Sequence, residues 1–338
     1  MILVTGATGL VGSHLLWHLL QKESQVVAIR RNSSQPRLLE YVFGFYTNDP
    51  QLYMDRIVWR IADVLDAASI AAAMENVSVV YHCAAVVSLG NDENSMTETN
   101  ITGTRNVTEA ALAAGVTKFC FVSSIAACGN APRYELIDEN SSFNRNSHRT
   151  AYSQSKFSSE QVVWEAAKKG LNVVIVNPGV ILGVSGTNKG SMRIFAQVRS
   201  GLPFFSYGGS GYVDVRDVVK AMIMLTQSQI SGERFILVAE NCSNKEILSL
   251  MAKGIKKTSP FIGLHKNLLL SIGYLAEISG KVFGFTPPFD RSLARSVSHR
   301  SYYSNRKVKE AIDIQFIPIA QSVKDVCDYL YLKEEKIS

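Results

Sequence analysis

The chain of 338 residues has 46% hydrophobic and 19% charged residues, the balance of an ordinary globular protein long enough for two domains. Its net charge is +6, with basic residues spread along the chain, which favours a solvated surface over a nucleic-acid-binding face. The five cysteines form no CxxC or Cys/His ligand pattern, and no secretory signal is recognised. We therefore expect buried free thiols, no metal site and a cytoplasmic location.

Strand-like and helix-like patterns alternate through the first two-thirds of the chain. Apolar, β-rich runs occur at 2–4, 25–29, 57–61, 77–83, 118–123 and 172–177, and helical patterns at 10–20, 66–75, 100–114 and 152–168. Gly115 and Gly170 stand where C-terminal helix caps are expected, and 38–55 forms an excursion before the third strand. The alternation predicts an α/β fold with a Rossmann-type doubly wound parallel sheet.

The pattern changes after Pro178. Glycines and short segments dominate 179–211, and a helical run at 215–227 and a strand at 234–239 follow. We predict a dinucleotide-binding core over 1–177 and a smaller substrate-binding lobe over 178–338. About 212–240 is expected to return to the core.

Residues 260–285 form an apolar segment that His265, Lys266, Glu277 and Lys281 interrupt. No uninterrupted stretch reaches the ~20 residues of a membrane-spanning helix. We interpret the segment as a helix packed on the lobe, so peripheral membrane contact is not expected. Shallow membrane contact and an oligomer interface are the alternatives.

A glycine turn joins the first strand to the first helix. Gly6 permits the tight turn, Gly9 lets the backbone approach a pyrophosphate, and Gly12 lets the helix pack closely on the strand, although the spacing is GxxGxxG rather than GxGxxG. The predicted phosphate contacts come from Gly6, Thr8, Gly9, Leu10, Val11 and Gly12.

The end of the second strand distinguishes the two dinucleotides. An NAD site usually has an acidic residue there, but this chain has Arg30 and Arg31, and a guanidinium suits a 2′-phosphate. NADP(H) is therefore favoured, and NAD(H) stays open. We place Asp63 and Val64 at the adenine, and Ala84 and Ala85 beside the middle of the cofactor.

Tyr152 and Lys156 lie four residues apart, on one face of a predicted helix. A carbonyl that accepts a hydride also needs a proton, and a nearby ammonium is expected to lower the pKa of the tyrosine for that task. Ser124, after the fifth strand, is predicted to orient the substrate oxygen, and Ser123 to touch the cofactor.

These motifs together resemble the extended short-chain dehydrogenase/reductase superfamily, and most closely its branch of dihydroflavonol-4-reductase-like and 3β-hydroxysteroid dehydrogenase-like enzymes. The resemblance rests on the glycine turn, Asp63, Ala84-Ala85, Asn100, Ser123-Ser124, Tyr152-x-x-x-Lys156, Asn177-Pro178-Gly179-Val180 and the stretch from Gly211 to Asp217. It implies a Ser124, Tyr152 and Lys156 triad and an Arg30 contact to the NADPH phosphate. It also implies that Asn100 supports an active-site water network. Pro178 and Val180 are implied to lie beside the nicotinamide.

The expected function is NADPH-dependent reduction of an aldehyde or ketone, by a monomer or homodimer with a small-molecule carbonyl substrate and no nucleic-acid partner. The first alternative is an NAD-dependent nucleotide-sugar epimerase or dehydratase. Two departures lower it, Ala127-Cys128-Gly129 and Val176-Asn177-Pro178-Gly179, which stand where epimerases carry other motifs. The second alternative is a non-catalytic, dinucleotide-responsive binding protein. The loops at 86–95, 128–148 and 186–211 are expected to face the substrate.

Overall fold

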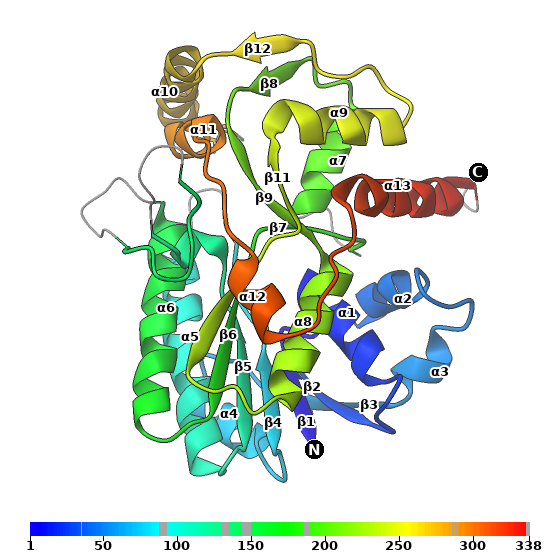
Figure 1. Ribbon diagram of the computed structural model, residues 1–338, viewed down its shortest axis with the longest axis vertical. Coiled ribbons are helices and arrows are strands. Elements are labelled where there is room, and N and C mark those ends of the chain that lie inside the picture. The colour runs from blue at the N-terminus through cyan, green and yellow to red at the C-terminus, as the bar shows by residue number, and fades with distance from the viewer. Residues whose placement is uncertain are drawn as a thin grey trace.

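The computed structural model describes residues 1–34, 36–87, 93–129, 135–143, 150–185, 190–285, 287 and 289–335, without the side chains of 93, 94 and 333–335. Within these residues, one parallel sheet has the strand order β10-β6-β5-β4-β1-β2-β3 (Figure 1). Its strands are β1 (Ile2–Thr5), β2 (Val26–Arg30), β3 (Ile57–Ile61), β4 (Val79–His82), β5 (Lys118–Val122), β6 (Val173–Pro178) and β10 (Glu233–Leu237). The predicted α/β fold with a doubly wound sheet is confirmed.

Helices cover both faces of this sheet because successive strand residues point to opposite sides. Val4 belongs to one apolar cluster with the helix residues Leu15 and Val218, whereas its neighbour Leu3 belongs to another with Val107 and Val163. The first layer contains α1 (Leu10–Leu19), α2 (Arg37–Phe43) and α8 (Val215–Gln227). The second contains α4 (Ala67–Ala73), α5 (Glu93–Ala113) and α6 (Ala151–Lys168).

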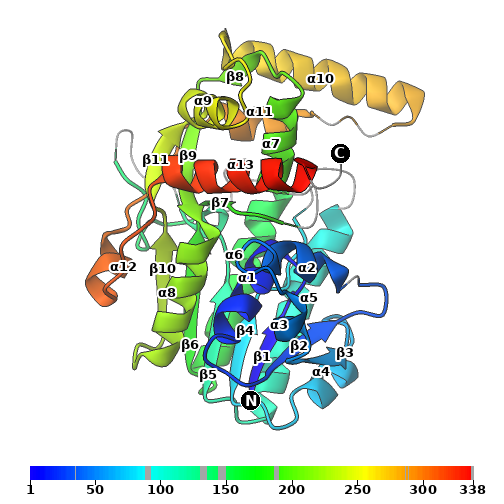
Figure 2. The ribbon, with the colours of Figure 1, turned by 90° about the vertical axis from the view of Figure 1, so that its right-hand side faces the viewer.

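The lobe lies beyond the carboxyl ends of the sheet strands (Figure 2). It holds a small sheet of β7 (Val180–Leu182), β9 (Gly209–Asp214) and β11 (Glu240–Ser243), and a strand pair of β8 (Phe204–Ser206) and β12 (Ile262–Leu264). Its helices are α7 (Ser191–Arg199), α9 (Asn244–Gly254), α10 (Lys266–Phe283), α11 (Arg291–Ser298) and α13 (Ile319–Glu335). The short helix α12 (Arg306–Ala311) packs against β10.

The core elements agree with the sequence patterns to within a few residues, except that the helix expected at 100–114 begins earlier, at Glu93. Gly115 and Gly170 have φ values of +66° and +104°, as the predicted helix caps require. The excursion at 38–55 is folded: α2 and α3 (Gln51–Met54) hold an aromatic cluster in which Trp17 stacks on Tyr46 at 4.9 Å.

The lobe is more helical than the sequence analysis expected. The segment 179–211 contains α7, and the sequence patterns did not identify α9, α11, α12 or α13. Four cysteines are buried and Cys83 is half-buried, all five as free thiols. Parts of the expected substrate-facing loops, at 88–92, 130–134, 144–149 and 186–189, lie outside the described residues.

Candidate active site

The glycine turn follows β1 and begins α1 with tightly apposed backbone. Gly6 has a φ of +66°, and a Cβ atom there would lie 2.6 Å from the amide nitrogen of Ala84. A Cβ on Gly12 would lie 2.2 Å from the Gly6 carbonyl oxygen. Helix α1 therefore starts close against the strand end, and its first amides, those of Leu10 and Val11, have no intrahelical acceptor. Such amides form an anion-binding helix start.

The end of β4 lies beside this turn, because β1 and β4 pair in parallel. The Ala84 amide donates a hydrogen bond to the Thr5 hydroxyl at 3.2 Å, which fixes the backbone after β4 against the turn. Ala84 is half-buried and Ala85 is exposed. The two predicted alanines therefore leave the neighbourhood of the turn free of large side chains.

Arg30 ends β2, the strand on the other side of β1. Its guanidinium lies over the Trp59 ring at 5.9 Å, and its Nε atom is buried without a hydrogen-bond partner. The neighbouring Arg31 is exposed. An oriented guanidinium with an unpartnered donor at this sheet edge suits an anionic group.

Asp63 and Val64, after β3, are tied to the helices beside them. The Asp63 carboxylate accepts the Leu65 amide at 3.0 Å, and the Val64 carbonyl accepts the Asn106 side chain at 2.9 Å. A Cβ atom on Gly103 would lie 2.8 Å from the Val64 side chain. These contacts hold the backbone after β3 against α5.

Ser124 and Tyr152 meet where β5 ends and α6 begins. The Ser124 oxygen accepts the Ala126 amide at 3.1 Å, and the Ser124 side chain lies near enough to the Tyr152 phenol to act on its pKa, in the lowering direction. Thr150 caps α6 through the Ser153 amide at 3.1 Å and so fixes the start of the tyrosine-bearing helix. The two predicted catalytic hydroxyls are therefore brought together.

Lys156 is buried in α6 and is bound to the end of β5. Its Nζ donates to the Val122 carbonyl at 2.8 Å and lies 5.2 Å from the centre of the Phe121 ring. Burial lowers the pKa of Lys156 to about 8, an effect that Glu160 partly offsets. Burial also raises the pKa of Tyr152, and the neighbouring Ser124 side chain opposes that rise. The Lys156 ammonium is thus held at the strand end, and its expected effect on the tyrosine pKa stays a prediction.

Ser123 and the β6–β7 turn complete the cofactor side of the site. The Ser123 hydroxyl is buried and has no hydrogen-bond partner. Pro178 is buried at the end of β6 and Val180 is half-buried in β7, and a Cβ on the intervening Gly179 would lie 2.4 Å from the Gly211 carbonyl oxygen. The unpartnered Ser123 hydroxyl, the unpartnered Arg30 Nε and the glycine cradle all fit a bound dinucleotide.

Asn100 positions the loop after β4 through hydrogen bonds to protein groups, and its expected support of an active-site water network stays a prediction. Its amide oxygen accepts the Val86 amide at 2.8 Å, and its nitrogen donates to the Val86 carbonyl at 3.1 Å and to the Ser155 hydroxyl at 3.0 Å. Its main-chain carbonyl accepts hydrogen bonds from Thr104 and Ser159. Asn100 thereby joins the loop after β4 to the helix that carries Tyr152 and Lys156.

The sequence analysis missed a buried charged network behind the serine. Asn177 donates to the Ser124 carbonyl at 2.9 Å and also to Glu160, which is fully buried and pairs with Arg234 at 3.2 Å. Arg234 in turn donates to the Glu139 carbonyl. One signal was present in the sequence, since Glu160 stands four residues after Lys156 on the same helical face.

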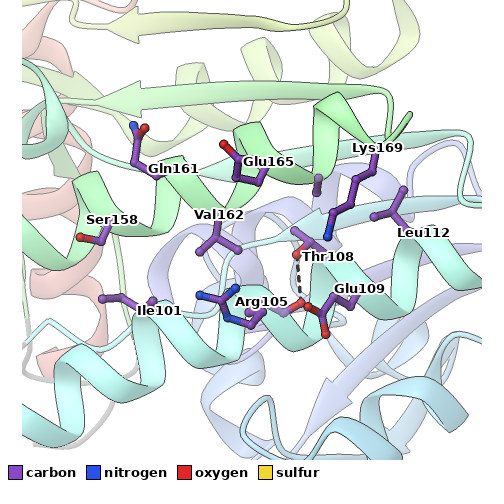
Figure 3. Close-up of a pocket in the computed structure, with 11 residues that line it drawn as sticks. Ile101, Arg105, Thr108, Glu109, Leu112, Ser158, Gln161, Val162, Glu165 and Lys169 are labelled. Atoms are coloured by element: carbon purple, nitrogen blue, oxygen red, sulfur yellow. Dashed lines mark hydrogen bonds between the residues drawn. The ribbon is translucent and has the colours of Figure 1, made fainter.

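A separate groove lies between α5 and α6, lined by charged side chains such as Arg105, Glu109, Glu165 and Lys169 (Figure 3). None of the predicted site residues lines it. Within the described part of the chain, no cluster of His, Cys, Asp or Glu side chains is arranged to hold a metal ion. The helices described there include none with the length and apolar character needed to cross a membrane.

The sequence matches the model of the NAD dependent epimerase/dehydratase family over residues 2–237. It is 29% identical to a putative dihydroflavonol 4-reductase of Synechocystis sp. over 330 residues, which cover 95% of this chain and 92% of that protein. It is 30% identical to sterol demethylase protein B of Methylococcus capsulatus, covering 81% of this chain and 80% of the relative. Cinnamoyl-CoA reductase 2 of Arabidopsis thaliana is 28% identical, with coverages of 75% and 77%.

Solved structures share the fold along nearly the whole chain. The crystal structure of gox2253 superposes with a TM-score of 0.82 at 25% identity, covering 98% of both chains. The UDP-glucose 4-epimerase of Thermus thermophilus, solved in complex with NAD, gives a TM-score of 0.73 at 20% identity, also covering 98% of both chains. The resemblance to extended short-chain dehydrogenases/reductases is confirmed by the family match and by the reductase relatives.

Proposed function

Because the chain belongs to the NAD dependent epimerase/dehydratase family, whose members are NAD(P)-dependent oxidoreductases and epimerases, we propose that it is an NADPH-dependent reductase of an aldehyde or ketone. The observation that carries the proposal is the placement of Ser124, after β5, beside Tyr152, at the start of α6, where the Ser153 hydroxyl donates to the Ala126 carbonyl at 2.5 Å and ties the two segments together. Two hydroxyls that lie together at the sheet edge where the glycine turn begins can orient a carbonyl oxygen and give it a proton. A carbonyl reduction needs this proton as well as the hydride.

The chain's own residues supply binding, orientation and the proton. When bound, the nicotinamide supplies the hydride. Ser124 is fixed by the Ala126 amide and turns its hydroxyl proton toward the substrate oxygen. Tyr152 donates its phenolic proton to that oxygen as negative charge develops on it. Lys156, released from the Val122 carbonyl, would hold the nicotinamide ribose and restore a cation near the phenol.

The preference for NADP(H) rests on the end of β2. Arg30 has a buried, unpartnered Nε, and no carboxylate follows the strand to repel a 2′-phosphate. The family name and the NAD-bound structural neighbours keep NAD(H) as the competing cofactor.

We further propose a partly apolar carbonyl substrate. Asn100 holds the loop after β4 beside α6, and Val86 and Val87 of that loop are 38% and 61% exposed. Apolar side chains at the rim of a carbonyl site suit an organic carbonyl compound better than a sugar nucleotide. The relatives that match over most of the chain include a putative dihydroflavonol 4-reductase and cinnamoyl-CoA reductases.

The test is the loss of NADPH absorbance with a panel of aldehydes, diketones, flavanonols and ketosteroids, run in parallel with NADH. Consumption that favours NADPH supports the reductase. No consumption with any carbonyl, together with tightly bound NAD(H) and interconversion of sugar nucleotides, would instead support the epimerase. Cofactor binding that alters a partner interaction without any turnover would support the non-catalytic alternative.

Tyr152→Phe tests the proton-donor role in the same assay. It should lower kcat by about 10²–10⁴-fold, because only the donated proton is lost, while the NADPH dissociation constant stays within about twofold. Tyr274→Phe is the control, since Tyr274 is 49% exposed on α10, outside the expected substrate-facing loops, and its substitution should leave both quantities unchanged. Loss of NADPH binding in Tyr152→Phe would contradict the role assigned to the phenol.

A further inference from the structure

Helix α10 lies at the top of the lobe (Figure 2). It exposes apolar side chains along its whole length. Its small buried side consists of Leu269, Gly273 and Gly280. The exposed apolar side chains are Leu268 (50%), Ile272 (41%), Leu275 (62%), Ile278 (41%), Val282 (69%) and Phe283 (77%). Such continuous apolar exposure differs from the scattered single residues of an ordinary protein surface.

The exposed face is a regular stripe on the side away from the lobe. Leu268, Ile272, Leu275 and Val282 follow one another at spacings of four, three and seven residues, which places them on one line of the helix. The only acidic residue of the helix, Glu277, pairs with Arg291 at 2.7 Å and so belongs to the packed side. The stripe therefore carries no charge.

Contacts with α11 hold the helix in place while the stripe stays exposed. Arg291 lies over the Tyr274 ring at 4.9 Å and donates its main-chain amide to Glu277 at 2.9 Å. A Cβ atom on Gly273 would lie 2.8 Å from the Asp290 carbonyl oxygen, so the two segments touch through their backbones. The stripe is thus a fixed surface rather than a frayed end.

Aromatic side chains extend the apolar surface at both ends of the helix. Phe261, just before β12, is 71% exposed, and Phe285, just after α10, is 48% exposed. We call the exposed apolar residues on the helix and beside it in the sequence the α10 face (Phe261, Leu268, Ile272, Leu275, Ile278, Val282, Phe283 and Phe285).

The surplus positive charge of the chain is concentrated in the same region. Residues 253–300 contain eight Lys or Arg and two Asp or Glu, a surplus of six that equals the net charge of the whole chain. The exposed Lys266 and Lys281 stand near the two ends of α10, and the exposed Lys256 and Lys257 precede Phe261. Basic residues occur along the whole sequence, but outside 253–300 acidic residues balance their charge.

We propose that the α10 face docks on the surface of a lipid bilayer that contains anionic headgroups, with α10 lying parallel to the membrane plane. An apolar helical stripe with flanking lysines is the pattern of interfacial helices. A second copy of the chain fits less well, because a two-fold interface would bring two positively charged segments together. The reduction chemistry at Ser124 and Tyr152 does not depend on this docking.

The test measures co-sedimentation of the full chain with phosphatidylcholine vesicles that contain phosphatidylglycerol, and with pure phosphatidylcholine vesicles. We expect binding to the anionic vesicles that weakens in high salt and is weaker on the neutral ones. The double variant Leu275→Gln/Val282→Gln should lower the partition coefficient roughly tenfold or more, because it removes two inserting side chains. Lys266→Gln/Lys281→Gln should lower it by roughly fivefold per lysine on anionic vesicles.

Leu52→Gln is the matched control, since Leu52 is 59% exposed on α3 and should bind vesicles as the unmodified chain does. Unchanged thermal unfolding midpoints would show that the variants are folded. The proposal is overturned if the unmodified chain does not bind anionic vesicles, or if Leu275→Gln/Val282→Gln binds them equally well. It is also overturned if light scattering shows a homo-oligomer that this double variant dissociates.

Discussion

Arg30 is the residue on which the choice between NADPH and NADH should depend. Its guanidinium is held over Trp59 and its Nε has no protein partner, whereas Arg31 is exposed. A charge-assisted hydrogen bond contributes about 1.5–3 kcal/mol, so Arg30→Gln should weaken NADPH binding by roughly tenfold or more. Binding of NADH, which lacks the 2′-phosphate, should change little. Titration calorimetry with both nucleotides measures the two effects.

Calorimetric titration of Arg31→Gln distinguishes the contribution of Arg31 to NADPH binding from that of Arg30. Because Arg31 is exposed, its substitution should weaken NADPH binding less than that of Arg30. Equal losses of NADPH and NADH binding in Arg30→Gln would indicate damage to the sheet edge rather than loss of a phosphate contact. A larger effect in Arg31→Gln would assign the phosphate to Arg31.

His82 connects Thr5, at the end of β1, to Asn100 on α5 through a directed chain of hydrogen bonds. The Thr104 hydroxyl donates to the Asn100 carbonyl at 2.6 Å, so it accepts from His82 Nε2 at 3.1 Å. His82 Nδ1 then accepts from the Thr5 hydroxyl at 2.7 Å. This assignment makes the ring neutral, and burial lowers the pKa of His82 to about 3.

The neutral ring predicts a pH-dependent contribution of His82 to stability. Below about pH 6.5 the unfolded chain binds a proton at His82 that the folded chain does not, so stability falls as the pH drops toward 3. The variant His82→Gln has no imidazole at this position, so it does not lose stability in this way when the pH falls. The unmodified chain and the variant differ in their free energy of unfolding. This difference should therefore become smaller by about 2 kcal/mol when the pH falls from about 7.5 to about 5. Urea unfolding at both pH values measures this difference, and a constant difference would refute a buried neutral His82.

At the scale of elements, the contact between β1 and α1 sets the geometry of the glycine turn. A Cβ atom on Gly12 would lie 2.2 Å from the Gly6 carbonyl oxygen, which is backbone and cannot rotate away. Gly12→Ala should therefore cost roughly 3 kcal/mol or more of unfolding free energy and weaken nucleotide binding. Gly115→Ala is the comparison, because only its φ of +66° opposes the change, at about 1 kcal/mol. Similar losses in the two variants, measured by urea unfolding, would contradict the close packing of helix on strand.

The helices and strands of the core could be predicted because each has a recognisable residue pattern within its own segment. Strand runs such as 118–123 are continuously apolar, and Gly6, Gly9 and Gly12 mark the turn between a strand and a helix. The lobe gave weaker signals, although α13 repeats buried residues at Ile319, Val323 and Val326, a helical spacing that the sequence analysis did not use. Its partners come from distant segments, so residue pattern alone does not show where it packs.

In the candidate site, too, some features could be predicted from residue types and others depend on contacts that the sequence does not show. Residue types predicted Ser124, Tyr152 and Lys156, and the structure places the first two near each other. The partner of Lys156 is the Val122 carbonyl, and a backbone group leaves no residue-type signal in a sequence. The buried pair of Glu160 and Arg234 depends on β10 joining β6, a contact between segments far apart in the chain.

On the scale of the whole molecule, α13 connects the lobe to the core. The Tyr329 hydroxyl donates to the Tyr41 carbonyl at 2.6 Å, which joins the helix to α2. Arg216, on the core helix α8, bonds Asp214 and Asp325, each at 2.7 Å, and Asp325 lies on α13. Both carboxylates raise the pKa of the arginine, so the guanidinium is held in its charged form between the two parts of the molecule.

Asp325→Ala should loosen this connection. It removes one of two carboxylates from a half-buried guanidinium, a hydrogen bond to a charged group that contributes about 1–2 kcal/mol to unfolding free energy. Asp328→Ala is the matched control on the same helix, because Asp328 pairs with Lys324 on the exposed surface, where such pairs contribute less than about 0.5 kcal/mol. Urea unfolding should therefore show a clear loss only for Asp325→Ala, and hydrogen exchange should quicken in α13 before it does in the central strands. Equal stability of the two variants would mean that apolar contacts such as Ile319 and Val323 alone hold α13 in place.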